Sequence, residues 1–183
     1  MLESKLPREG LAQRVQVVVG DFAQWLSARC DCGFEAVVSS EFLGEIDSNE
    51  MTRFFVECYR VLRPGGITIQ SFLSPIPRNS RQRLVIEANV NPRWTVFPPK
   101  EWLSPPSGLV REQLEKAGFG RVRRSTLRSN LTIKASAARR LLQTWNIKDE
   151  FRSEYGKELD EEGLEIPDWI VVSGIKPAPS KQR

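Results

Sequence analysis

Apolar, β-branched runs alternate with amphipathic segments in the first part of the chain, and this alternation limits the folds open to it. Buried strands are predicted at residues 14–20, 34–39 and 67–72, because short runs rich in valine and isoleucine that end at turn residues are typical of strands covered on both faces. Residues 22–28 and 48–62 have apolar side chains at helical spacing. Strand–helix–strand–helix–strand order predicts an α/β fold with a parallel sheet and right-handed crossovers.

Local signals mark both ends of the second helix. Ser48 is the predicted N-cap, and the neighbouring acids Asp47 and Glu50 suit the positive end of the helix dipole. The Pro-Gly-Gly sequence at residues 64–66 ends the helix, because proline and glycine do not continue it.

The pattern loosens after residue 73, where residues 74–106 are rich in proline. We interpret the whole as a single domain over residues 1–176 and a flexible tail at 177–183. The expected elements, in order, are a short helix at 81–89, a helix at 107–118 ended by Gly118, one strand at 120–133, two helices within 135–159 that meet near Asn146, and a final strand at 167–175.

The chain contains no histidine, which excludes Ser-His-Asp, Cys-His and histidine–metal mechanisms. A general base must then be Asp, Glu, Tyr, Lys or a thiolate. Cys30 and Cys32 are two residues apart and Cys58 stands alone. Three cysteines without histidine predict neither a disulfide framework nor a metal site.

Charge and hydropathy indicate which partners and which location to expect for the protein. The net charge of +4 includes small basic clusters at residues 78–83 and 121–128, which weakly favour an anionic partner and more often are solvated surface. No nucleic-acid recognition motif accompanies them, so nucleic acid is not an expected partner. The apolar runs are too short to cross a bilayer and the N-terminus lacks the apolar stretch of a signal peptide, which predicts a cytoplasmic protein without a membrane partner.

Three segments in this order resemble the class I S-adenosylmethionine-dependent methyltransferase family: VVVGDF at 17–22, FEAVVSSEFLGEI at 34–46 and ECYRVLRPGG at 57–66. They look like the end of the third strand of that family, its fourth strand and following loop, and the helix and turn before its fifth strand. The resemblance implies a partial Rossmann-like methyltransferase sheet with mostly parallel strands, an antiparallel final pair and flanking helices.

Family members begin with a strand and a glycine-rich turn that lets the backbone approach the cofactor. Only a short charged segment precedes Arg14, and no G-x-G-x-x-G-like turn follows a strand. We therefore expect a truncated methyltransferase-like domain that binds S-adenosylmethionine weakly or not at all.

The resemblance also implies site residues. Asp21 would contact the adenine of the cofactor and Phe22 would flank it; the alternatives are an N-cap and a core side chain. Ser39, Ser40 and Glu41 would lie beside the transferred methyl group, with Glu41 as the base or the carboxylate that orients the acceptor. The alternative for Glu41 is a surface acid in a loop.

Two tryptophans are the candidate substrate-binding residues. Trp94 and Trp102 lie in the proline-rich segment, where similar methyltransferases place a substrate lid. There they could stack on a flat organic acceptor. The equally open alternative is that they pack in an ordinary minor core.

The implied function is a methyltransferase, or a fragment of one, that acts on a small organic molecule at oxygen, nitrogen or sulfur. An aromatic natural product would suit the tryptophans. The alternative is a non-catalytic subunit that pairs with a full-length methyltransferase, and a nucleic-acid-binding fragment is a third. Because a strand at 14–19 would leave an apolar edge unpaired, we expect a second copy or a larger partner to complete the sheet.

Overall fold

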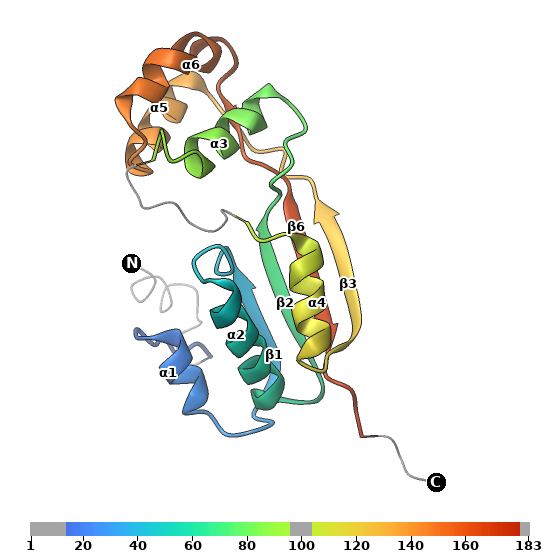
Figure 1. The fold of residues 1–183 in the computed structure, drawn as a ribbon. Coiled ribbons are helices and arrows are strands. Elements are labelled where there is room, and N and C mark those ends of the chain that lie inside the picture. The colour runs from blue at the N-terminus through green and yellow to red at the C-terminus, as the bar shows by residue number, and fades with distance from the viewer. Residues whose placement is uncertain (1–13, 96–103, 180–183) are drawn as a thin grey trace.

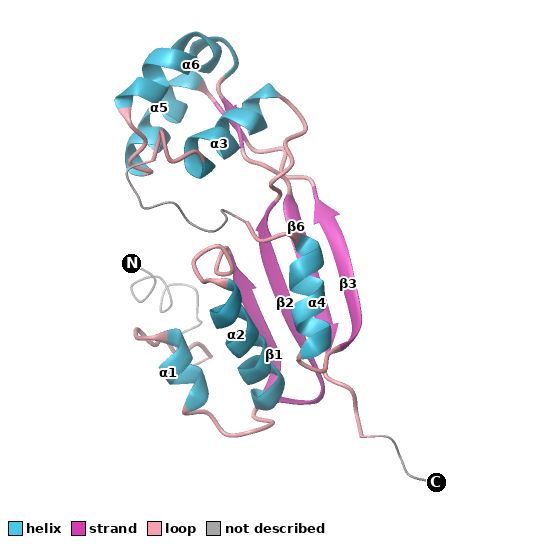
Figure 2. Ribbon diagram, in the orientation of Figure 1, coloured by secondary structure: helices cyan, strands magenta, loops and turns pink. Residues whose placement is uncertain are grey.

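The structure, a computed structural model, describes residues 14–95 and 104–179, and within them the chain forms helices, one four-stranded sheet and one two-stranded sheet (Figure 2). In chain order the elements are α1 (Phe22–Ser27), β1 (Phe34–Ser40), α2 (Ser48–Val61), β2 (Leu62–Leu73), α3 (Ser80–Val90), α4 (Ser107–Lys116), β3 (Gly120–Leu127), β4 (Thr132–Ile133), α5 (Ala135–Thr144), α6 (Asp149–Glu162), β5 (Leu164–Glu165) and β6 (Trp169–Ile175).

The larger sheet has the strand order β1-β2-β6-β3. β1 pairs with β2 in parallel, whereas β6 pairs antiparallel with both β2 and β3. β1, β2 and β3 therefore run in the same direction and β6 is reversed. This arrangement confirms the predicted α/β fold, in which a mostly parallel sheet ends in an antiparallel pair.

The strand predicted at residues 14–20 is wrong, because this segment contains no strand and Val19 is 91% exposed. A β-branched run forms a strand only where another strand offers its backbone hydrogen bonds. In the described sheet β1 pairs only with β2 and forms the edge. β1 therefore forms the sheet edge that was predicted at residues 14–19.

α2 and α4 cover one face of the larger sheet (Figure 1). The N-cap of α2 is Asp47 and not the predicted Ser48: the Asp47 carboxylate accepts from the backbone N–H of Glu50, while the Glu50 side chain accepts from the N–H of Asp47. A carboxylate suits this capping box better than a hydroxyl, because it also meets the helix dipole. The core behind these helices includes Phe55, Phe72 and Leu114.

A second hydrophobic core lies in a helical unit formed by α3, α5, α6 and the β4–β5 pair. Trp94, Phe151 and Leu142 are almost fully buried there. The two predicted helices within 135–159 are confirmed as α5 and α6, and they meet at Asn146, whose φ of 52° reverses the chain. The single strand predicted at 120–133 is instead β3 and the short β4, with Asn130 at φ 51° between them.

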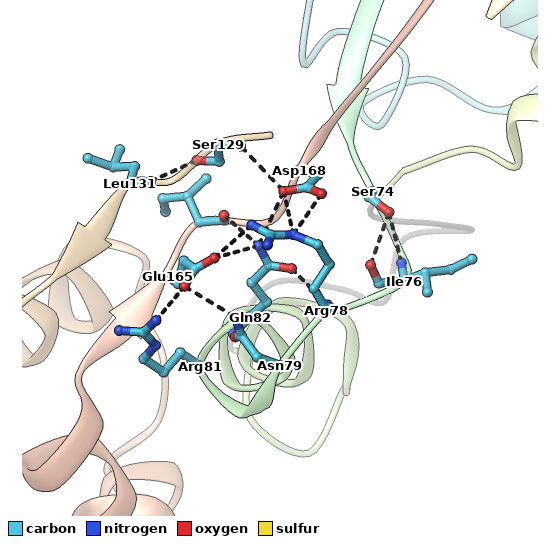
Figure 3. A network of polar contacts seen from close by, with 11 residues as sticks. Ser74, Ile76, Arg78, Asn79, Arg81, Gln82, Ser129, Leu131, Glu165 and Asp168 are labelled. Carbon is cyan, nitrogen blue, oxygen red and sulfur yellow. Dashed lines mark hydrogen bonds and ion pairs between the residues drawn. The ribbon is translucent and has the colours of Figure 1, made fainter. Parts of the chain in front are cut away.

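A buried polar network joins the helical unit to the sheet (Figure 3). The Arg78 guanidinium bridges two acids, with Nη2 3.0 Å from Glu165 Oε1 and Nε 2.8 Å from Asp168 Oδ2. Arg81 Nη2 lies 2.7 Å from the other Glu165 oxygen, and Gln82 Nε2 donates to Glu165 Oε1 at 3.0 Å. Both carboxylates are almost completely buried. Because every member is paired, the network fixes α3 and β5 at the end of the sheet.

The electrostatics of Asp168 follow from the same contacts. Burial alone would raise the pKa of Asp168, but hydrogen bonds from the Ser129 N–H, Arg78 and Gln82 outweigh burial and lower the pKa below its ordinary value. The main-chain oxygen of Asp168 also accepts from the Ser74 N–H at 2.6 Å. One residue thus holds the exits of β2 and β3 and the entry of β6 together.

Arg78→Met should lower the free energy of unfolding by about 3 kcal/mol, because it leaves two buried carboxylates short of a cation. Arg139→Met is the matched control, since Arg139 pairs with Asp160 at the surface and should cost less than about 1 kcal/mol. Urea denaturation of the three proteins measures both values. Equal stabilities of the two variants would contradict the structural role of the network.

Candidate active site

The carboxyl end of β1 carries three of the predicted site residues. Ser40 pairs with Ser71 of β2, so the ends of the two strands lie side by side. The Ser39 hydroxyl is hydrogen-bonded to Gln70 Oε1, and Gln70 Nε2 donates to Thr68 Oγ1 at 2.7 Å. Gln70 and Thr68 are fully buried, so Ser39 belongs to a structural chain of polar contacts. The Ser40 side chain is exposed at the end of the strand.

Glu41 turns out of the sheet directly after β1. Its φ of 57° lies in the left-handed region, and its backbone N–H still donates to the Ser71 oxygen at 2.8 Å. Among the described residues Oε1 is buried without a hydrogen-bond partner. A strained backbone that holds an unpartnered carboxylate oxygen at the end of a strand is an arrangement that favours function over packing.

The pKa of Glu41 is raised. Burial is the main cause, because it disfavours the charged form, and the nearby Glu45 carboxylate adds to it. A hydrogen bond with the Leu73 backbone acts in the opposite direction and does not cancel the rise. A carboxyl group whose pKa is moved toward neutrality suits proton transfer.

A pocket of about 230 Å³ lies between α1 and α2, beside this end of the sheet. Its floor is a cluster of three rings, Phe22, Phe42 and Phe54, with centroids 4.9 to 5.2 Å apart. Its rim carries charged side chains, among them Asp21 and Arg53. An aromatic floor with polar groups at the rim suits a flat, partly polar ring.

The structure brings Asp21 and Phe22 together at this pocket. The Asp21 carboxylate accepts from the Gln24 N–H at 2.8 Å and so forms the N-cap of α1, which confirms the capping alternative for Asp21. The same carboxylate lines the pocket. Asp21 can therefore cap α1 and contact a ligand, and the sequence had left both roles open.

Arg60 positions α1, next to these residues, and the sequence analysis did not identify it. Its guanidinium donates to the Leu26 oxygen at 3.0 Å and to the Arg29 oxygen at 2.8 Å, at the end of α1. It also pairs with Asp31 at 2.5 Å and Glu57 at 2.7 Å. Arg60 therefore fastens the end of α1 to α2, the two helices that flank the pocket. A basic residue in the last turn of a helix was the available signal.

The predicted substrate-binding tryptophans do not meet at this pocket in the described residues. Trp94 is 1% exposed, and its Nε1 donates to Glu87 Oε1 at 3.0 Å. Its ring contacts Phe151 and Tyr155 in the core of the helical unit, so the side chain has a packing role. Trp102 lies outside the described residues.

The cysteines lie apart from the pocket. Cys30 and Cys32 are exposed and Cys58 is buried, where burial raises the pKa of its thiol. Among residues 14–95 and 104–179, no group of three or more Cys, Asp and Glu side chains is arranged to hold a metal ion.

Comparisons with known proteins add to the geometry. Residues 1–70 match the family model described as a methyltransferase domain. No curated protein sequence matches the chain significantly.

Solved structures share the fold at low sequence identity. The chain is similar to a SAM-dependent methyltransferase from Archaeoglobus fulgidus, with 16% identity over 92% of this chain and 71% of that one and a TM-score of 0.55. It is also similar to the [4+2]-cyclase SpnF, with 18% identity over 96% and 60% and a TM-score of 0.58. A third is the apo S-adenosylmethionine-dependent methyltransferase SibL, with 16% identity over 95% and 39% and a TM-score of 0.56.

Residues 1–70 thus match a methyltransferase-domain model, and the fold is similar to that of S-adenosylmethionine-dependent methyltransferases. The predicted resemblance is thereby confirmed. The chain spans 60% of the cyclase and 39% of SibL. No described helix is long and apolar enough to span a membrane.

Glu41→Gln should make the protein more stable than the parent at pH 8 and leave it nearly unchanged at pH 4. The folded state holds the Glu41 proton to higher pH than the unfolded chain, whose Glu pKa is about 4.3. This contribution to stability is complete below that pKa and is lost as pH rises through the higher folded pKa. Urea denaturation at both pH values, with exposed Glu161→Gln as the control, measures it. Equal profiles for Glu41→Gln and the parent would show a solvated carboxylate.

Proposed function

We propose that the chain takes part in methyl transfer from S-adenosylmethionine to a small organic acceptor, with Glu41 as the general base. The observation that carries the proposal is the buried, unpartnered Oε1 of Glu41 at the carboxyl end of β1. Ligands of open α/β sheets bind at this end of the strands. The match of residues 1–70 to a methyltransferase-domain model supports the reaction class.

The residues at the pocket fit part of the cofactor. A pocket of about 230 Å³ is smaller than the roughly 300–1,000 Å³ of typical ligand sites. Asp21 and the Phe22 ring would hold a flat, amine-bearing ring such as adenine. The methionine portion has no comparable cradle among the described residues, because no glycine-rich turn follows a described strand. This partial fit supports weak cofactor binding by the chain alone.

When bound, S-adenosylmethionine would supply an electrophilic methyl group, whose bond to the sulfonium sulfur breaks as the acceptor bond forms and leaves the electron pair on the sulfur of S-adenosylhomocysteine. On the protein side, Glu41 in its ionised form would accept the proton of an acceptor hydroxyl, amine or thiol as the lone pair of that atom attacks the methyl carbon. The carboxylate becomes a carboxylic acid. Burial favours this neutral form, which is why the pKa of Glu41 is raised.

We propose where the acceptor binds from the position of Glu41 in the sheet and not from the tryptophans. The helical unit lies beyond the carboxyl ends of β2 and β3 (Figure 1). Glu41 follows the carboxyl end of β1, which is parallel to β2, so it lies toward the same end of the sheet. Because Trp94 packs in the core, the proposal of an aromatic natural product as the acceptor rests on Trp102. We also propose a cytoplasmic location, which suits the exposed free thiols of Cys30 and Cys32.

A second candidate function is a non-catalytic subunit of a larger methyltransferase assembly. The exposed edge of β1 and the sheet face opposite α2 and α4 favour it. Val38 on β1 is 65% exposed and Leu127 on β3 is 57% exposed. An apolar sheet face of this kind is a typical site of association. A second copy or a full-length methyltransferase would cover it.

Calorimetric titration with S-adenosylmethionine tests the catalytic proposal. The isolated chain should bind no tighter than about 100 µM, because several contacts worth about 1 to 3 kcal/mol each are lacking. Asp21→Ser keeps a capping hydroxyl and should weaken binding further, whereas Glu41→Gln should not change it. Binding below about 1 µM would contradict the partial fit. No binding at millimolar cofactor would favour the non-catalytic subunit.

The chain should self-associate at concentrations of tens of micromolar, which lie in the usual range for weak homodimers. Val38→Lys places a charge on the exposed edge strand and should shift the protein toward monomer. Val56→Lys is the matched control, because Val56 is also half exposed but lies on α2. Light scattering after size exclusion measures the mass. A stable parent monomer that unfolds cooperatively would remove the support for an interface on β1.

A further inference from the structure

The basic cluster on β3 is not used by the proposed methyl transfer. Four exposed arginines lie within or next to this strand, and in the described part of the chain none of them forms an ion pair. They are Arg121, Arg123, Arg124 and Arg128. Elsewhere the described arginines are commonly paired, as Arg60, Arg78 and Arg139 are. Guanidinium groups that lack an ion-pair partner can bind the carboxylates of another molecule.

β3 is also a free edge. In the part of the chain that the structure describes, it is the last strand in the order β1-β2-β6-β3 and pairs only with β6. After a register shift near Arg121, residues 123–127 pair in order with residues 173–169. The outward side of this regular stretch presents backbone N–H and C=O groups, and β3 contains no proline to interrupt them. The strand therefore offers hydrogen bonds and positive charge along the same line.

Arg123 and Arg124 project to opposite faces of the sheet, because successive strand residues alternate. Arg124 lies on the face that α4 covers, since its Nε donates to Ser107 Oγ at 3.0 Å. Arg123 pairs with Ser173 on the other face. A duplex nucleic acid resting on one face would meet one of these two charges. A strand added in the plane of the sheet would place side chains beside both.

We propose that the β3 edge binds an extended acidic segment of a protein partner by strand addition. The backbone of the segment would pair with residues 123–127, and two adjacent acidic residues would meet Arg123 and Arg124. Leu127 lies on the same face as Arg123 and four residues further along, so an apolar residue of the partner would cover it. An antiparallel partner then has the pattern apolar-x-x-acid-acid.

Fluorescence anisotropy with a labelled Thr-Val-Thr-Thr-Glu-Glu-Thr peptide tests this proposal on the full chain. Binding should weaken by at least about tenfold for Arg123→Glu with Arg124→Glu. A Lys-Lys peptide should bind that variant and not the parent. The same peptide with alternate backbone N-methyl groups keeps its charges but cannot complete the ladder, so it should also lose about tenfold. Circular dichroism confirms that the variant is folded.

Three outcomes would overturn the proposal. Undiminished binding of the N-methylated peptide would show attraction by charge alone. Tighter binding of double-stranded RNA than of the peptide would show a nucleic-acid surface. No binding of any peptide would show that the arginines only protect the edge from aggregation. Each result is independent of S-adenosylmethionine, so it does not depend on the proposed methyl transfer.

Discussion

The pairing of Arg78 with Glu165 and Asp168 is the interaction on which the arrangement of the two cores depends. Without it, two nearly buried carboxylates would lie at the junction of the sheet and the helical unit, where they have little access to water. Since the network also binds the exits of β2 and β3, it sets which part of the helical unit lies above the carboxyl end of the sheet. Glu41, the proposed base, follows β1 toward that end, so the surroundings of a bound acceptor would depend on contacts that lie outside the proposed site.

The elements that could be predicted from the sequence are those whose signals are local. Helix α2, with acids at its start and Pro-Gly-Gly after it, and the break at Asn146 both follow from capping and backbone preference. The strand at 14–20 failed because strand formation depends on a neighbour, which a run of valines cannot reveal. The two-residue strands β4 and β5 are too short for any periodicity. Arg78 and its acids are 87 and 90 residues apart, so no local pattern joins them.

The same division applies to the candidate site. Asp21, Phe22 and Glu41 follow strand ends or begin a helix, and the structure places them at the pocket or beside the end of β1. The sequence segments that contain these residues therefore predict well where the residues lie in the fold. It does not reveal that the Glu41 oxygen lacks a partner, or that Arg60 holds α1 in place, because both depend on how separate elements pack. Trp94 shows the converse limit: an aromatic residue in an irregular segment was as compatible with a core as with a binding site, and only packing decided it.

The two edges of the larger sheet differ in chemistry, and this difference constrains how the protein can associate. β1 presents the sequence Phe-Glu-Ala-Val-Val-Ser-Ser, with few charges to oppose pairing, whereas β3 presents arginines on both faces. Two β3 edges would repel one another, so identical chains cannot join there without bringing guanidinium groups together. Continuation of the sheet by a second copy is therefore favoured at β1, and an acidic partner is favoured at β3. Because the edges lie at opposite ends of the strand order, both contacts can form at once, and one sheet can serve self-association and recognition of a different protein.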